Sequence, residues 1–330
     1  METVLVTGGA GYIGSHTCKL LSGSGFSPVV YDNLSTGHEA NVKWGPLVRG
    51  DIRDTHLLRH TIKKWQPVCL IHFAAAAYVG ESTVDPRKYY NNNVAGTLSV
   101  LDTCLDTRLR NVVFSSSCAT YGIADQLPLT EQAIQAPVNP YGRTKLIGEM
   151  MLADYDAAYH MHYVALRYFN AAGADLDGEL SEKHTPETHL IPRALLTAAG
   201  RLDTLRVFGD DYDTPDGTCI RDYIHVVDLA EAHVLAVLHL LNGGDCLAVN
   251  LGSGHGTSIR EIISAIERLT HHKVPVTFEQ RRAGDPPVLY ADPRSAESDL
   301  HFVAQHSDID TIISSAAPTF GLEVSHGAMA

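Results

Sequence analysis

A tyrosine and a lysine four residues apart have a spacing suited to proton transfer. Tyr141 and Lys145 occur in the run NPYGRTK, in which Asn139 can cap a helix and Pro140 suits its first position. Residues four apart lie on one face of a helix, so we expect the two side chains to be neighbours. A phenol has a pKa of about 10, and a nearby ammonium group favours the phenolate, which makes Tyr141 a candidate general base.

A run of serines is the second candidate for this chemistry. Ser115, Ser116 and Ser117 follow an apolar stretch that has the character of a buried strand. Ligands of open α/β sheets bind beyond the carboxyl ends of such strands. We expect the Ser117 hydroxyl to bridge a substrate hydroxyl and Tyr141, and at least one other serine to satisfy the end of the strand.

Three glycines near the start of the chain have the spacing of a dinucleotide-binding turn. Gly8, Gly11 and Gly14 lie in TGGAGYIG, between an apolar strand and a helical pattern. Glycines there let backbone N–H groups approach a pyrophosphate, beside the positive end of the helix. Asp32 follows about 20 residues later, where a carboxylate binds both ribose hydroxyls and repels a 2′-phosphate, so NAD is favoured over NADP. Asp51 ends the next strand and is a weaker candidate for a contact to the adenine.

The elements that must position these residues alternate between strands and helices. Continuous apolar strands separated by crossover-length segments predict a parallel sheet that is buried on both faces. The class is therefore α/β, a Rossmann-type doubly wound parallel sheet with a smaller C-terminal α/β lobe. The expected strands are 3–7, 28–31, 47–50, 68–73, 112–115 and 163–168.

The pattern of alternating apolar and helical segments ends after Phe169. Residues 174–189 are polar and irregular, and 208–220 form a Gly/Asp/Pro loop. A helix over 226–241 and a strand over 247–251 follow, and a further helix begins near Ser258. We predict a nucleotide-binding domain over 1–170, to which 222–251 returns, and a substrate lobe over most of 171–330.

Composition excludes several classes of protein. The formal net charge of −13 disfavours a nucleic-acid binder, and no run of about 18 apolar residues indicates a membrane span. An apolar strand pattern begins at Thr3, so we expect no signal peptide. Six scattered cysteines without a C-x-x-C pair suggest reduced thiols in a cytoplasmic protein. The 18 histidines include no H-E-x-x-H, and we expect no metal site.

Taken together, these segments resemble those of UDP-glucose (UDP-galactose) 4-epimerases of the extended short-chain dehydrogenase/reductase family. The similarity covers nearly the whole chain. The matching segments are TGGAGYIGSH, YDNLSTG, GDIRD, IHFAA with VGES, YYNNNVAGT, FSSSCATYG, NPYGRTK, LRYFNAAGA, HLIP, GDDYDTPDGTCIRDYIHVVDLA and RRAGDP.

The resemblance implies a catalytic cycle and a set of cofactor contacts. Tyr141 takes the proton of the sugar 4-hydroxyl, Ser117 hydrogen-bonds the 4-oxygen, and Lys145 also binds the nicotinamide ribose. Hydride passes from C4 to tightly bound NAD, the 4-keto sugar turns, and hydride returns to its other face. The implied cofactor-side residues are Gly8, Gly11, Tyr12, Ile13, Gly14, Asp32, Asn33, Asp51, Ile52, Phe73, Ala74, Ala75, Asn92, Ser115, Tyr141, Lys145 and Phe169.

The resemblance also implies contacts to the UDP-sugar. Arg221 and Arg282 suit a diphosphate in a chain of net negative charge. The full implied set is Ser117, Asn170, His189, Leu190, Arg221, Arg282, Asp285 and Leu289.

Three positions depart from the family pattern or bear on substrate choice. An alanine run at 74–77 replaces a lysine that relatives often have near the cofactor phosphates. His189 stands where some relatives have asparagine. Leu289, at a position that gates N-acetylated sugars in relatives, is neither very large nor very small.

Other readings of the motifs remain. A 4-epimerase for UDP-N-acetylhexosamines or UDP-pentoses would share every catalytic residue. A 4,6-dehydratase would need a carboxylate after the fifth strand, where this chain has Cys118 and Ala119. A sensor on the same fold would commonly lack the tyrosine–lysine pair. Relatives are commonly homodimers joined through helices of the large domain.

Overall fold

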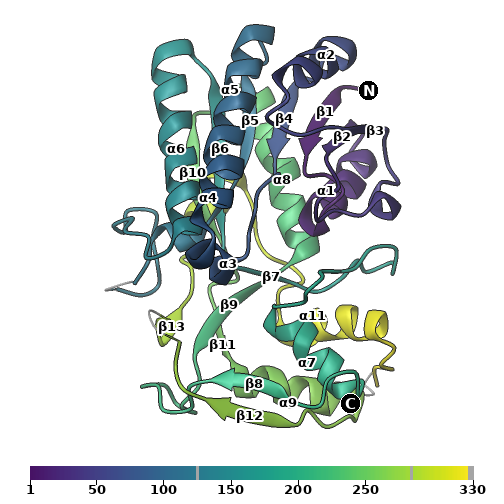
Figure 1. The fold of residues 1–330 in the computed structure, drawn as a ribbon, viewed down its shortest axis with the longest axis vertical. Helices are drawn as coiled ribbons and strands as arrows, with labels where there is room; N and C mark the ends of the chain where they lie inside the picture. Colours follow the sequence, from purple (N-terminus) through teal and green to yellow (C-terminus); the bar gives the residue numbers. More distant parts are fainter. Residues whose placement is uncertain (124–125, 283–284, 326–330) are drawn as a thin grey trace.

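The main sheet has seven parallel strands in the order β10-β6-β5-β4-β1-β2-β3 (Figure 1). The structure is a computed structural model that describes residues 1–123, 126–282 and 285–325, so part of the RRAGDP segment lies outside it. The strands are β1 (Thr3–Thr7), β2 (Ser27–Asp32), β3 (Leu47–Arg49), β4 (Cys69–His72), β5 (Asn111–Ser117), β6 (His162–Tyr168) and β10 (Leu247–Leu251). The chain reverses direction across the sheet between β1 and β4, which places a ligand crevice at that switch point. The predicted fold class is confirmed.

Helices cover both faces of this sheet. Helices α1 (Tyr12–Gly23) and α8 (Val226–Leu241) pack together on one apolar cluster with β1, β4 and β6. On the other face, α2 (Thr55–Trp65), α5 (Gly96–Thr107) and α6 (Pro140–Tyr159) share a second apolar cluster. The central strands β1, β4 and β5 are buried along almost their whole length, as their continuous apolar runs predict, whereas the edge strand β3 is partly exposed. None of the helices in the described ranges is both long and apolar enough to cross a membrane.

Short helical segments connect β4 to α5, and others follow β2 and β5. They are η1 (Glu39–Asn41), α3 (Val79–Val84), α4 (Pro86–Tyr89), η2 (Tyr90–Ala95) and η3 (Cys118–Thr120). The η2 segment is a π-helical turn, a distortion frequently found at functional sites, and it contains Asn92.

A second, smaller layer lies below the carboxyl ends of the main strands (Figure 1). Its sheets join β7 (Asn170–Ala172), β9 (Ile220–His225), β11 (Gly256–Ser258) and β13 (Val288–Leu289), and separately β8 (Leu205–Phe208) with β12 (Val276–Glu279). The helices of the C-terminal half besides α8 are α7 (Leu190–Ala198), α9 (Ile259–Thr270), α10 (Arg294–Leu300), α11 (Ile309–Ala316) and η4 (Ala317–Phe320). A third apolar cluster holds α7, α9 and α11 together, while α10 packs against the main sheet through Ala296 and Leu300.

The chain passes between the two layers more than once. Strand β9 belongs to the small sheet, whereas α8 and β10 return to the main sheet, where β10 pairs with β6. The exact division into domains over 1–170 and 171–330 stays a prediction.

Candidate active site

A cavity of about 800 Å³ lies across the carboxyl ends of the main strands. It collects residues from the ends of β1, β2, β4, β5 and β6, as expected for an open parallel sheet. Of the residues predicted from the sequence, those that line it are Gly8, Gly11, Tyr12, Ile13, Gly14, Asp32, Asn33, Ile52, Phe73, Ala74, Ala75, Asn92, Ser115, Ser117, Tyr141, Lys145, Phe169, Asn170, His189 and Leu190.

The glycine turn forms one wall of this cavity. Gly8 has φ of +75°, and a Cβ there would lie 2.7 Å from the backbone nitrogen of Ala74. A Cβ on Gly14 would collide with the carbonyl oxygen of Gly8. Gly11 precedes α1 without any side-chain cap, so the first N–H groups of the helix remain for a ligand. The turn therefore fits the diphosphate of a dinucleotide.

Asp32 ends β2 at the edge of the cavity. Its Oδ2 accepts a hydrogen bond from the Ala10 N–H at 3.0 Å, and its Oδ1 accepts one from the Leu34 N–H at 2.8 Å. Burial raises the pKa of Asp32, and the two backbone bonds oppose the rise. Each carboxylate oxygen has a second lone pair, so the fixed side chain can still accept ribose hydroxyls. These features fit the NAD that the sequence predicts.

Asp51 does not line the cavity. Its carboxylate pairs with Arg53 at 2.7 Å and accepts a hydrogen bond from the Asn33 amide at 3.1 Å. The hydrogen bonds from Arg53 hold the pKa of Asp51 well below its usual range. Since Asn33 and Arg53 both line the cavity, Asp51 orients two lining residues, and its own contact to a ligand stays a prediction.

The proposed reactive residues meet where β5 ends and α6 begins. The Asn139 side chain caps α6 by accepting from the Gly142 N–H at 2.8 Å, with Pro140 in the first turn, as predicted. Lys145 donates to the Ser115 carbonyl at 2.6 Å, and its Nζ lies 5.8 Å from the centre of the Tyr141 ring. Ser117 is the last residue of β5. The predicted proximity of these side chains is confirmed.

Burial dominates the pKa values of Tyr141 and Lys145, and the predicted lowering of the Tyr141 pKa by Lys145 stays a prediction. Burial raises the pKa of Tyr141 to about 12, although the Ser117 hydroxyl acts in the opposite direction. Burial also lowers the pKa of Lys145 to about 7, against the attraction of Glu149. Desolvation disfavours the phenolate and the ammonium alike. A cationic group entering the cavity would favour the phenolate.

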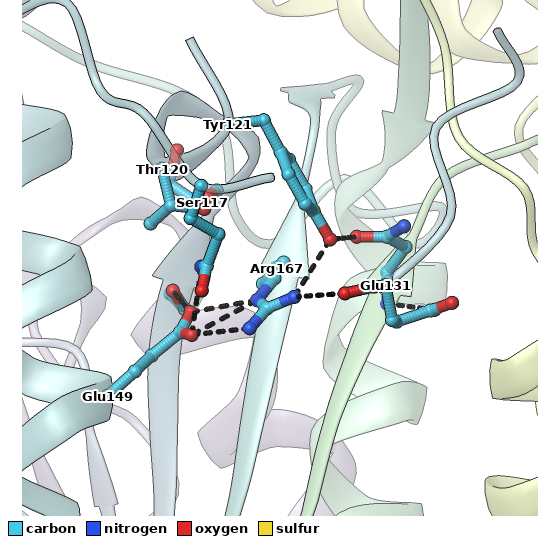
Figure 2. A network of polar contacts seen from close by, with 9 residues as sticks. Ser117, Thr120, Tyr121, Glu131, Glu149 and Arg167 are labelled. Atoms are coloured by element: carbon cyan, nitrogen blue, oxygen red, sulfur yellow. Dashed lines mark hydrogen bonds and ion pairs between the residues drawn. The ribbon is translucent and has the colours of Figure 1, made fainter. Parts of the chain in front are cut away.

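Figure 2 shows a buried ion pair between Arg167 and Glu149 in a polar network close to Ser117. Arg167 of β6 donates to Glu149 of α6 at 2.6 Å and to the Tyr121 hydroxyl at 2.9 Å, and both charged side chains are less than a tenth exposed. Glu149 also accepts a hydrogen bond from Ser116, the neighbour of Ser117. The network ties β5, β6 and α6 together. Our sequence analysis missed it, although Glu149 lies one helical turn beyond Lys145.

The residues predicted to hold the UDP-sugar divide into two groups. Asn170 lines the cavity, as do His189 and Leu190 at the start of α7. By contrast, Arg221 pairs with Asp285 at 2.8 Å, and neither lines the cavity.

The remaining two predicted substrate residues also lie away from the cavity surface. Arg282 stacks 3.9 Å from the centre of the Phe208 ring. Leu289 is buried in a small apolar cluster with Phe169, which does line the cavity. Direct contacts from Arg221, Arg282, Asp285 and Leu289 to substrate therefore stay predictions.

Residues 181–184 and His189, from the segment between β7 and α7, line one side of the cavity, and the start of this segment is attached to α1. Lys19 of α1 pairs with Asp175, Asp177 and Glu179 at 2.7–2.8 Å. The Tyr12 hydroxyl donates to the Gly173 carbonyl at 2.6 Å. These contacts attach the segment to the first helix.

Several lining residues were not predicted. Lys88 lines the cavity and pairs with Glu81 at 2.7 Å. Glu182, Lys183 and His184 also line it. They come from the irregular segment, where no periodicity indicates the direction of a side chain.

Comparison with known proteins identifies the family. The model of the NAD dependent epimerase/dehydratase family matches residues 4–252. The chain belongs to this family. It is 52% identical over 315 residues to a UDP-glucose 4-epimerase of Rhizobium leguminosarum bv. trifolii, covering 96% of each chain. The family resemblance predicted from the motifs is confirmed.

Two solved structures agree with this membership. A UDP-glucose 4-epimerase from Brucella ovis in complex with NAD superposes with a TM-score of 0.97 at 66% identity, covering 98% of this chain and 100% of that one. A UDP-glucose 4-epimerase from Stenotrophomonas maltophila, with bound NAD and formylated UDP-arabinopyranose, gives a TM-score of 0.94 at 38% identity, covering 97% and 98%.

Proposed function

We propose that the protein is an NAD-dependent isomerase that interconverts UDP-galactose and UDP-glucose at C4. The observation that carries this proposal is one continuous cavity that joins the glycine turn and Asp32 to Ser117, Tyr141 and Lys145. The close relatives named as UDP-glucose 4-epimerases support the same reaction.

The residues of the chain handle the proton of the reaction. Tyr141 removes the proton of the sugar 4-hydroxyl as the C4–H bond breaks, and it returns the proton when C4 is reduced again. Ser117, fixed at the end of β5, hydrogen-bonds the 4-oxygen. Bound NAD supplies the hydride acceptor and donor, and its cationic nicotinamide favours the phenolate of Tyr141. Lys145, held on the Ser115 carbonyl, binds the nicotinamide ribose.

Turning of the hexose requires that the nucleotide carry most of the binding energy. The 4-keto sugar must present its other face to the same hydride donor without leaving the site. Asn170, His189 and Leu190 would hold the UDP portion; their place in the lining of the same cavity supports this assignment.

The decisive experiment follows purified protein and UDP-galactose by NMR, without added cofactor. We expect UDP-glucose to accumulate toward an equilibrium mixture, and we expect Tyr141→Phe to slow conversion by about 10²–10⁴-fold. No conversion by the parent protein, even after addition of NAD, would refute the proposal.

A second candidate substrate has a specific observation in its favour. The Stenotrophomonas maltophila relative holds a formylated UDP-pentose at 38% identity, so UDP-pentoses belong in the same assay. UDP-N-acetylhexosamines form the other alternative, because every catalytic residue would be shared. Conversion of either sugar faster than UDP-galactose would change the assigned substrate.

The protein is further proposed to be a cytoplasmic homodimer. The six cysteines are unpaired thiols, which supports a reducing compartment. Leu98 of α5 and Met150 of α6 are apolar side chains exposed on packed helices of the large domain, which supports association through these helices. Light scattering at micromolar concentration, with Met150→Lys as the disrupting variant, tests the dimer.

A further inference from the structure

Two histidines and two glutamates converge in the segment before α7. They are Glu182, His184, Glu187 and His189, and one ligand atom from each lies within 4.8 Å of the others. Both imidazoles present Nδ1 to the carboxylates. The sequence pattern is E-x-H-x-x-E-x-H, which our search for metal motifs did not include.

The distances between these atoms are those of a small coordination shell. His184 Nδ1 lies 3.2 Å from Glu182 and 3.5 Å from Glu187, and His189 Nδ1 lies 2.9 Å and 3.0 Å from the same two carboxylates. Zinc bound tetrahedrally at about 2.0–2.1 Å keeps its ligand atoms about 3.3 Å apart. Small shifts would therefore place all four atoms around one ion.

One potential ligand atom of the cluster is not satisfied by a hydrogen bond. His184 Nδ1 is buried, and among the residues that the structure describes it has no hydrogen-bond partner of acceptable geometry. His189 Nδ1 faces two carboxylates although it carries at most one proton. A cation at the centre would satisfy both nitrogens.

The charge and burial of the cluster are compatible with a divalent ion. The side chains of Glu182 and Glu187 are only 6% and 11% exposed, and two buried carboxylates need two compensating positive charges. A divalent ion with two neutral imidazoles makes the site electrically neutral.

The surrounding backbone holds the ligands in place. Glu187 Oε1 accepts hydrogen bonds from the N–H groups of Thr188 and His189 at 2.8 Å. His189 precedes α7, and its side chain makes no capping bond to that helix. The His38 ring contacts the Lys183 carbonyl at 3.2 Å, between two of the ligands in sequence. Supporting contacts of this kind orient the ligands of metal sites.

We propose that these four residues form a structural site for a divalent transition-metal ion, with Zn²⁺ as the ion tested first. Four protein ligands leave no open position, which is typical of a structural rather than a catalytic site. Because Glu182, His184 and His189 line the cavity, the ion would fix one of its walls. The proposal goes beyond the epimerase function and departs from our expectation of no metal.

The test measures metal directly, so its outcome does not depend on turnover. The protein is stripped with a chelator, loaded with Zn²⁺, desalted and assayed by mass spectrometry for metal per chain. We expect about one Zn²⁺ per chain, as a closed four-ligand site requires. His184→Gln and Glu187→Gln should retain less than about a tenth of that amount.

Two controls separate this site from others. His255→Gln removes an exposed histidine outside the cavity and should retain the metal. Cys246→Ser disables a second group, Asp156, His162 and Cys246, that can also bind an ion. Loss of zinc from Cys246→Ser with full retention by His184→Gln would overturn the proposal.

A spectroscopic readout completes the test. Co²⁺ loaded in place of Zn²⁺ should give the intense visible absorption of a tetrahedral site in the parent and in His255→Gln, but not in His184→Gln. A parent protein that binds no Zn²⁺ after loading would also overturn the proposal. The four residues would then be an ion-paired network of protonated histidines.

Discussion

The residues assigned to proton transfer and those assigned to the UDP-sugar are placed by different means. Tyr141, Lys145 and Ser117 lie on a helix and a strand of the main sheet, and all three line the cavity. Arg221, Arg282 and Leu289 belong to the small lobe, where the first pairs with Asp285 and the others pack against aromatic rings. The first group already lines the cavity, whereas the second would have to exchange its protein partners to reach a substrate there. We therefore expect catalytic geometry to depend on the main sheet and substrate selectivity to depend on the small lobe.

The largest expected effect comes from removing the phenol. Tyr141→Phe should lower turnover by about 10²–10⁴-fold, because it removes the general base and keeps the ring. UDP binding, measured by calorimetry, should stay within a few-fold of the parent, since the hydroxyl is assigned to the sugar alone. Unchanged turnover would show that Tyr141 is not the general base, and the assignment of proton transfer to this group of residues would be wrong.

The second-largest effect should be a loss of stability when the buried pair of Arg167 and Glu149 is broken. Glu149→Gln leaves the buried guanidinium of Arg167 without a counter-charge, and we expect the free energy of unfolding to fall by about 3–5 kcal/mol. Urea denaturation measures the change. The matched control is the double variant Glu149→Met with Arg167→Met, which removes both charges and should recover much of the loss. An unaltered urea midpoint in Glu149→Gln would show that the ion pair does not support the sheet.

The main-sheet residues could be predicted from the sequence more completely than those of the small lobe. Tyr141 and Lys145 were placed correctly because helical geometry converts a spacing of four into contact, and Asp32 because a strand end has a fixed place on the sheet. The pKa of Tyr141 was not predictable, because it depends on burial by distant segments. Glu182 and His184 were missed because an irregular segment has no period. The roles of Arg221 and Leu289 rest on family resemblance, since pairing between lobes cannot be derived from spacing.

A moderate effect should come from the small-lobe arginine. Arg221→Ala should weaken UDP-sugar binding by roughly 10–100-fold, the worth of a charge-assisted hydrogen bond to a diphosphate, with a smaller change in kcat. Arg206→Ala, which removes an exposed arginine paired with Glu279, is the control and should leave KM near the parent value. Equal KM values for both variants would mean that the Arg221–Asp285 pair stays closed during the reaction.

The smallest effect should be one of selectivity. Leu289 packs behind Phe169, so Leu289→Tyr should push that ring toward the hexose. We expect about a tenfold loss of any activity on UDP-N-acetylglucosamine, with UDP-glucose nearly spared. Competition assays with both sugars measure the ratio, and an equal loss on both would refute selective gating.

The contacts of Lys19 bear on how long a cofactor stays. One ammonium group holds three carboxylates of residues 175–179 against the helix whose first turn faces the dinucleotide. Residues 181–184, which follow this attachment, line the cavity, so we expect the residence time of the dinucleotide to depend on movement of this segment as well as on its own contacts. Because Asp177 and Glu179 are exposed and dissolved salt screens their pairs with Lys19, exchange of labelled NAD should accelerate as ionic strength rises. The enzyme would then retain its cofactor at low ionic strength and release it more readily at high ionic strength.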